Sequence, residues 1–190
     1  MTDSSTAAAS DDGSAVDPAL STTGRRQALS LARWLANERI EAVYTSPLLR
    51  ARETATPLAE RLGLAPVVEP GVVEYDHQSS TYVPLEEIKA TDYDRWRELV
   101  VDGGLYAGVD LPAFRRAVSA ALERIIAAHA GGRVAVACHG GVINAWTAEI
   151  LGVADLFVFE PAYTGISRFL AASSGERSVV SLNETAHLRE

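Results

Sequence analysis

The sequence predicts an α/β fold of three layers, in which helices cover both faces of a mostly parallel β-sheet. Stretches with the periodicity of amphipathic helices alternate with short apolar runs along the chain, and the longest runs do not alternate apolar with polar residues. Strands that are apolar on both sides need cover on both faces, as in parallel sheets of α/β proteins. With 190 residues and 47% apolar content, the chain can form one domain with a substantial core.

Residues 1–16 are rich in Ser, Ala, Asp and Gly and show no periodicity, so we expect a flexible lead-in there and a single domain over 17–190. In chain order, the expected elements of that domain are a helix over 25–38, a strand over 40–45, a helix over 48–62, a strand over 67–73, a helix over 114–130, a strand over 134–138, a helix over 142–151 and strands over 167–172 and 179–182. The stretch 74–112 holds short helical pieces and several aromatics, and we interpret it as a surface excursion over a site.

Composition restricts the classes of partner. A net charge of −8 argues against binding to nucleic acid or to an anionic membrane surface, because both need a basic face. No run approaches the roughly 20 apolar residues of a membrane span, and the first residues lack the features of a signal peptide. The single cysteine, Cys138, excludes an internal disulfide, fits a reducing compartment and is expected in the core. We therefore expect a cytoplasmic protein, whose oligomeric state the sequence does not indicate.

Two segments that directly follow expected strands carry side chains suited to an anion. Ligands of parallel α/β sheets bind beyond the carboxyl ends of the strands. Arg50 falls in the first turn of a helix, where backbone amides favour an anion and a guanidinium adds a forked grip for phosphate. His139 ends a buried strand and precedes Gly140 and Gly141, where backbone can approach a ligand closely.

Each motif also has an ordinary structural interpretation. Arg50 and Arg52 are both explained as solvated charges on a helix, and a lone histidine such as His139 is usually held by local hydrogen bonds at a strand end. Ser46 and Pro47 are residue types typical of a helix start, where Ser46 would cap the helix. Two motifs at one edge of the predicted sheet favour a binding site over unrelated structural roles.

Other site chemistries lack the residues that they need. A cysteine phosphatase requires an arginine six residues after its cysteine, but Asn144 stands at that distance from Cys138. The chain contains neither the Gly-x-Ser-x-Gly turn of α/β-hydrolases nor a Gly-x-x-x-x-Gly-Lys nucleotide loop. The histidines are scattered, with no pair at helical spacing, so no metal site and no cofactor are predicted. They are His77, His129, His139 and His187.

Three motifs follow one another in a fixed order: DPALSTTGRRQA at 17–28, SPLLRARETA at 46–55 and VAVACHGG at 134–141. Together they resemble the histidine phosphatase (phosphoglycerate mutase-like) superfamily, and the resemblance extends from Asp17 through almost the whole chain. It implies the phosphoglycerate mutase-like form of the α/β fold and phosphomonoester hydrolysis. The shortness of the chain favours a phosphatase over a mutase, acting on a small phosphorylated substrate that the sequence does not identify.

The resemblance also implies site roles. A histidine takes the phosphoryl group and water then removes it. Arg50 and Gly140 would bind the phosphate, and His139 would be the second active-site histidine. Glu74 would give a proton to the leaving oxygen, with Asp76 as the fallback acid. The substrate pocket would draw on Tyr75, Asp76, Tyr82, Tyr93 and Trp96, although these aromatics are equally explained as packing under a loop.

One part of the family pattern is absent from this sequence. The family opens with an apolar strand that ends in Arg-His-Gly, carries the nucleophilic histidine and lies beside the strand that leads to His139. Without that strand, two ladders of backbone hydrogen bonds lose their partner, and residues 1–16 are too polar to replace it.

Three explanations of this absence stay open. In the first, the sequence starts inside the protein, with Met1-Thr2 as the last two positions of Arg-His-Gly-x-Thr. In the second, the chain is a non-catalytic pseudophosphatase that binds a phosphorylated ligand or partner. In the third, it is a misfolded product. We expect the first, because in the second Arg50, Glu74 and His139 would persist without catalytic work.

Overall fold

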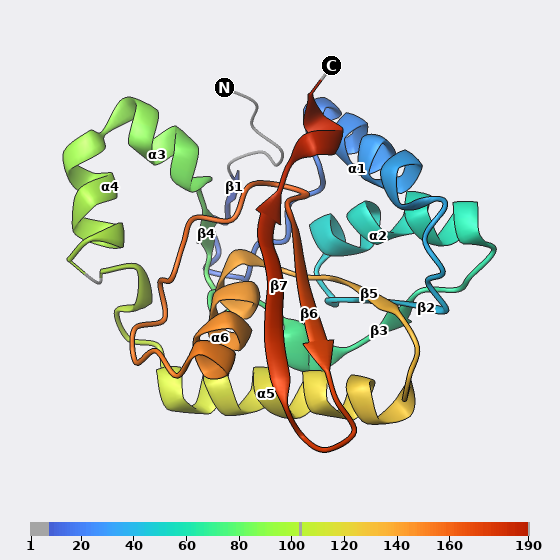
Figure 1. The fold of residues 1–190 in the computed structure, drawn as a ribbon. Coiled ribbons are helices and arrows are strands. Elements are labelled where there is room, and N and C mark those ends of the chain that lie inside the picture. The colour runs from blue at the N-terminus through green and yellow to red at the C-terminus, as the bar shows by residue number, and fades with distance from the viewer. Residues whose placement is uncertain (1–7, 103, 190) are drawn as a thin grey trace.

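The computed structural model describes residues 8–102 and 104–189, and its helices cover both faces of a parallel sheet (Figure 1). That sheet consists of β2 (Ala42–Thr45), β3 (Val67–Val68) and β5 (Val134–Ala137), in the order β3-β2-β5. All its strands run parallel. The α/β fold class predicted from the sequence is therefore confirmed.

One face of the sheet is covered by α1 (Thr22–Leu35) and α2 (Leu49–Leu62). Leu35 of α1 and Leu58 of α2 pack with Val43 of β2 in one core cluster. The first helix starts and ends three residues earlier than predicted, because the Ser21 side chain caps it by accepting the Gly24 N–H at 3.0 Å.

The other face is covered by α5 (Leu111–Ala128) and α6 (Gly140–Leu151). Val118 of α5 and Trp146 of α6 belong to a second core cluster, against which Val136 of β5 packs. The chain continues into β6 (Ile166–Ala171) and β7 (Arg177–Glu184), an antiparallel pair, and ends in the short 3₁₀ helix η3 (Ala186–Leu188). None of the helices in the described part of the chain is long and apolar enough to cross a membrane.

The segment between β3 and α5 departs from the sheet. The strand predicted over 67–73 stops at Val68, because Pro70 and Gly71 lead into the 3₁₀ helix η1 (Pro70–Val72). The expected short helices are α3 (Leu85–Thr91), α4 (Tyr93–Val100) and the 3₁₀ turn η2 (Gly104–Tyr106). Figure 1 shows α3 and α4 projecting to one side, and neither contains a buried residue.

Part of the amino-terminal segment has a partner that its composition did not indicate. In β1 (Ala8–Ala9), the backbone pairs antiparallel with β4 (Thr81–Tyr82). Further on, the Val16 N–H donates to the Ser79 carbonyl at 3.0 Å. Residues 8–16 therefore run past the segment that leads into α3. Residues 1–7, including the Met1-Thr2 pair, lie outside the described residues.

The two groups of strands are not joined to each other. β5 pairs with β2 along one edge and β6 pairs with β7 along one edge, and over residues 8–102 and 104–189 no strand lies between β5 and β6. A cavity of about 2200 Å³ borders both strands and extends to the carboxyl end of β5.

Candidate active site

Arg50 and Arg52 have different environments, although they lie on the same helix. Arg50 is in the first turn of α2, as predicted, and only 11% of its side chain is exposed. Its Nη1 lies 3.6 Å from an Asp17 carboxylate oxygen, and its Cζ lies 4.8 Å from the centre of the Tyr82 ring. Arg52 is exposed. The solvated-charge interpretation therefore holds for Arg52 but not for Arg50.

Ser46 contacts both the start of α2 and the histidine. Its Oγ accepts the Leu48 N–H at 3.3 Å, in keeping with the predicted helix cap, and the same buried Oγ lies 2.7 Å from Nε2 of His139. The Ser46 N–H donates to the Ala137 carbonyl, which extends the pairing of β2 with β5. Asp17 adds a second cap, since its two carboxylate oxygens accept the Leu49 N–H at 2.8 and 3.0 Å.

His139 is held as a neutral imidazole. Burial lowers its pKa to about 3, and the positive charges of Arg50 and His77 contribute in the same direction. A phosphate dianion beside this ring would oppose all three effects in part and raise the pKa.

Glu74 faces the start of α6. It is buried, with Oε2 accepting the Gly141 N–H at 3.0 Å and Oε1 accepting the Tyr75 N–H at 3.1 Å. Burial raises its pKa from the ordinary 4.5 to about 7, against the effect of the Gly141 hydrogen bond. Burial also raises the pKa of Asp76, which the Arg50 charge opposes. Near neutral pH, Glu74 can therefore both give and accept a proton.

The two glycines after His139 differ in the room around them. A Cβ on Gly141 would lie 2.2 Å from Glu74 Oε1 and 2.7 Å from a Tyr75 ring carbon. A Cβ on Gly140 would meet only Pro161, at 3.8 Å. A glycine is thus required at Gly141, where the Glu74 side chain comes close, and the approach of a ligand to this pair stays a prediction. The role of Gly140 in binding phosphate stays a prediction.

We expect Gly141→Ala to destabilise the fold by about 1–3 kcal/mol, because the added methyl group must displace Glu74 or Tyr75. Gly140→Ala is the matched control, and it should change the free energy of unfolding by less than about 1 kcal/mol. Urea denaturation of both variants measures the difference. Equal stability of the two variants would contradict the placement of Glu74.

The cavity wall includes some of the aromatics expected in a substrate pocket. Tyr75, Asp76 and Tyr82 line it, but Tyr93 and Trp96 do not. Those two stack on each other on α4 with ring centres 5.4 Å apart, so the structure does not bring them to the site. Tyr75 packs against other aromatic rings, and burial keeps its hydroxyl protonated by raising its pKa.

Sequence reasoning missed three contributors to the site. Asp17 belongs to the DPALSTTGRRQA motif, so the sequence held a signal that could have placed it at the site. Ser46 was interpreted only as a helix cap. His77 was set aside as one of several scattered histidines, yet its Nδ1 lies 2.8 Å from the Glu74 carbonyl oxygen and its charge affects His139. Among the residues that the structure describes, no three His, Cys, Asp or Glu side chains are grouped to hold a metal ion.

Ser46→Ala should change the hydrogen bonding of His139. We expect the tautomer equilibrium of the imidazole to change, because the Ser46 hydroxyl is the hydrogen-bond partner of Nε2, and we expect a loss of about 1–3 kcal/mol in the free energy of unfolding. Histidine ¹⁵N chemical shifts across a pH titration report both the tautomer and the pKa. Unchanged shifts would show that the Ser46 contact does not govern this ring.

Fold and site together describe an α/β protein in which a buried guanidinium, a neutral imidazole and a buried carboxyl border one cavity at the parallel sheet. A family model described as the histidine phosphatase superfamily (branch 1) matches residues 5–185. This chain belongs to the histidine phosphatase superfamily.

Named proteins that are similar to this chain are consistent with its membership of this family. Phosphoserine phosphatase 1 of Hydrogenobacter thermophilus is 31% identical over 180 residues, which cover 92% of this chain and 85% of that protein. Among solved structures, Bacillus stearothermophilus YhfR superposes with a TM-score of 0.73 at 22% identity, covering 91% of this chain and 88% of that one. A mycobacterial glucosyl-3-phosphoglycerate phosphatase superposes with a TM-score of 0.69 at 23% identity, covering 89% and 88%. These two structures support the phosphoglycerate mutase-like fold.

Proposed function

We propose that this chain carries the phosphate site and the general acid of a phosphomonoester hydrolase that works through a phosphohistidine. The observation that carries the proposal is the placement of a buried carboxyl with a pKa near 7, Glu74, at the same sheet edge as the buried Arg50 guanidinium and the His139 imidazole. The first group supplies a proton and the other two bind an anion.

In the proposed reaction, Arg50 binds the phosphate of the substrate and His139 takes up a proton in its presence. A nucleophilic imidazole forms a bond to phosphorus while the ester oxygen leaves with the proton of Glu74. The Glu74 carboxylate then takes a proton from water as that water attacks phosphorus and the phosphorus–nitrogen bond breaks. We assign the nucleophile to an Arg-His-Gly segment that residues 1–190 do not contain.

The proposed substrate is a small phosphorylated compound in the cytoplasm, with no part for nucleic acid or membrane. One relative is named a phosphoserine phosphatase, which makes phosphoserine the first compound to test. Tyr75, Asp76 and Tyr82 line the cavity beside Arg50, and we propose that they contact the alcohol part of the substrate. The segment 74–112 would then cover the site from one side.

The alternative is a pseudophosphatase that binds a phosphorylated ligand or partner without turnover. One observation supports it: Arg50 and His139 are both buried and the charge of Arg50 acts on His139 in residues 1–190, so two groups suited to phosphate are present without the Arg-His-Gly segment.

The test compares residues 1–190 with a version extended at its amino end by the in-frame sequence encoded upstream. Both are assayed for hydrolysis of phosphoserine, 3-phosphoglycerate and p-nitrophenyl phosphate and for binding of inorganic phosphate. We expect both to bind phosphate and only the extended protein to turn over, with a difference of roughly 10⁴-fold or more. Binding by both without hydrolysis would support the pseudophosphatase, and no binding by either would refute both functions.

A further inference from the structure

Two segments that are distant in sequence line the cavity around the proposed phosphate site. They are residues 74–88 and the loop 157–165, which connects α6 to β6. The Tyr163 hydroxyl of the loop donates to Glu86 Oε2 at 2.7 Å, and this hydrogen bond joins the two segments. They therefore form one wall, which we call the alcohol wall, because the alcohol part of the substrate would lie against it.

The alcohol wall reaches the site residues from both of its segments. In the first segment, the centre of the Tyr82 ring lies 4.8 Å from Cζ of Arg50. In the loop, Pro161 lies 3.8 Å from the position of a Cβ on Gly140, the residue after His139. A substrate whose phosphate contacts Arg50 would therefore have its alcohol part beside this wall.

A buried amide of α6 holds the loop in place. Asn144 is only 2% exposed. Its Oδ1 accepts the N–H groups of Val158 and Phe159 at 3.0 and 3.1 Å, and its Nδ2 donates to the carbonyls of Phe159 and Gly140 at 2.9 and 3.1 Å. Because both donors and both acceptor positions of this amide are used, the loop has a fixed position relative to the site.

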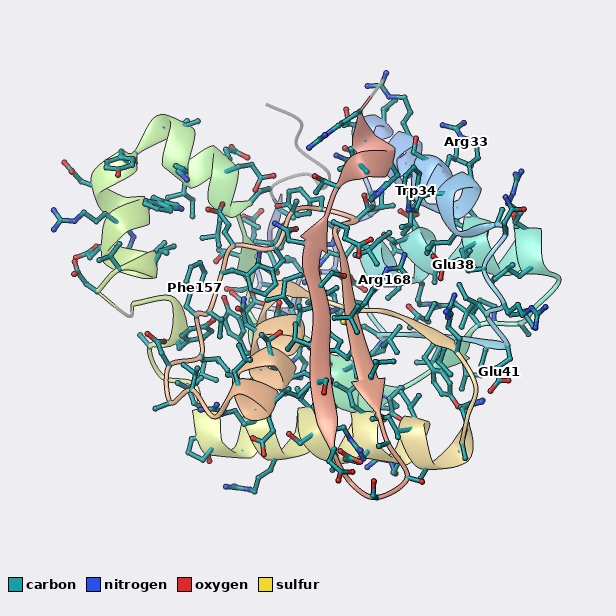
Figure 2. The ribbon with its side chains drawn as sticks, in the orientation of Figure 1. Arg33, Trp34, Glu38, Glu41, Phe157 and Arg168 are labelled. Carbon is teal, nitrogen blue, oxygen red and sulfur yellow. The ribbon has the colours of Figure 1, made fainter. Side chains whose placement is uncertain are left out.

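The alcohol wall contains neither lysine nor arginine. Four further arginines line the cavity elsewhere, and they are Arg39, Arg133, Arg168 and Arg177. Arg133 and Arg168 donate to Glu38, which precedes Arg39, at the amino end of β5, and Figure 2 shows Arg168 extending from β6 toward Glu38. Arg177 donates to a carboxylate of α5. Among the lining residues that the structure describes, this leaves Arg50 as the arginine beside the alcohol wall.

Asp76 is a carboxylate of the alcohol wall that responds to the charge of Arg50. It lines the cavity, and none of the described side chains donates a hydrogen bond to it. Burial raises its pKa, and the charges of Arg50 and His77 oppose that effect. A phosphate on Arg50 would bring negative charge to the same guanidinium and leave Asp76 with less compensation. A cation carried by the substrate would restore the balance.

We propose that Asp76 determines the substrate class of this site, which is a phosphomonoester whose alcohol part carries an ammonium group and no carboxylate. The inference rests on the proposed function, because the phosphate must lie on Arg50. The Asp76 carboxylate pairs with the ammonium while Arg50 holds the phosphate. A carboxylate on the alcohol meets Asp76 and Glu86 instead, and the alcohol wall has no lysine or arginine to receive it.

Three phosphate esters that differ by one group at a time test this selectivity. Ethyl phosphate has neither group, O-phosphoethanolamine adds the ammonium, and O-phosphoserine adds a carboxylate to that. Isothermal titration calorimetry at pH 7 measures the binding of each ester, and of inorganic phosphate, to the 190-residue chain, so that no turnover is needed. We expect phosphoethanolamine to bind about tenfold or more tightly than either of the other two esters.

Asp76→Asn removes the charge and keeps the shape of the side chain. It should bring the affinities for ethyl phosphate and phosphoethanolamine to within about threefold of each other. Inorganic phosphate should still bind, which shows that the fold and the phosphate site are intact. The matched control is Asp94→Asn on α4, which removes the same charge from an exposed residue that does not line the cavity. This control should keep the preference for phosphoethanolamine, because distant surface charges are screened.

The outcomes separate the substrate class from the phosphate site. Binding of phosphate with equal affinities for the three esters, or tighter binding of phosphoserine than of phosphoethanolamine, would overturn the inference and keep the phosphate site. A preference for phosphoethanolamine that persists in Asp76→Asn would also overturn it, because another group would then bind the ammonium. Failure of the native chain to bind even inorganic phosphate would refute the phosphate site and the inference together.

Discussion

Glu74→Gln is expected to lower kcat of the hydrolytically complete enzyme by about 10²–10⁴-fold, because glutamine cannot give its proton to the leaving oxygen. Phosphate affinity below pH 6 should change little, since Glu74 is then uncharged in the native protein as well. Steady-state kinetics on the extended protein, with phosphate binding measured in parallel, test both parts. An unchanged kcat would remove Glu74 from the reaction.

The pH dependence gives Glu74 a second signature. Its pKa is raised to about 7, so the fraction that carries the proton falls above that pH, and kcat should fall with it. The raised pKa also means that the folded protein holds this proton more tightly than the unfolded chain does. The stability from that proton is present at acidic pH and is lost as pH rises through about 7. Glu74→Gln should remove both trends.

Asp76→Asn is the matched comparison, because the resemblance made Asp76 the fallback acid. We expect it to lower kcat less than about tenfold and to keep the decline above pH 7. If Asp76→Asn lost most of its activity and Glu74→Gln stayed active, Asp76 rather than Glu74 would be the general acid.

Arg50→Ala is expected to weaken binding of inorganic phosphate to the 190-residue chain by about 10–150-fold, the equivalent of losing a charge-assisted hydrogen bond of about 1.5–3 kcal/mol. Arg52→Ala is the matched control on the same helix, and its exposed side chain should leave affinity unchanged. Isothermal titration calorimetry at pH 7 measures both. Equal affinities for the two variants would mean that phosphate does not bind at this sheet edge.

The Arg50 variants should also change the neighbouring histidine. The Arg50 cation lowers the pKa of His139, so Arg50→Ala should raise that pKa even without ligand. Arg50→Lys keeps the charge but loses the planar fork, and we expect intermediate phosphate affinity with a nearly unchanged His139 pKa. Histidine ¹⁵N titrations distinguish the effect of charge from the effect of geometry.

Periodicity predicted those elements whose boundaries depend on local sequence. The helix expected over 114–130 is α5, and that expected over 142–151 is α6, which starts two residues earlier at Gly140. The strand over 67–73 was extended too far, because its apolar pattern outweighed the turn residues Pro70 and Gly71. The pairing of Ala8–Ala9 with Thr81–Tyr82 joins segments distant in sequence, and no local pattern indicates it.

The site residues also fall into those that the local sequence could place and those that it could not. Arg50 and His139 could be placed at one sheet edge because each follows a strand. The assignment of Glu74 needed the family resemblance, since the burial that raises its pKa is produced by the fold and no local pattern indicates it. Asp17 shares the capping role that was expected of Ser46 alone, because a helix cap can come from any carboxylate that the fold brings near, and sequence distance does not limit that choice.

The edges of β5 and β6 that have no strand partner in the described part of the chain also have a consequence for handling the purified protein. Exposed strand edges are templates on which neighbouring molecules pair, and such pairing increases with protein concentration. The net charge of −8 opposes it, but high salt screens that repulsion. Dilute, low-salt buffers should therefore keep the protein dispersed for longest, and concentrated stocks in high salt should associate most readily.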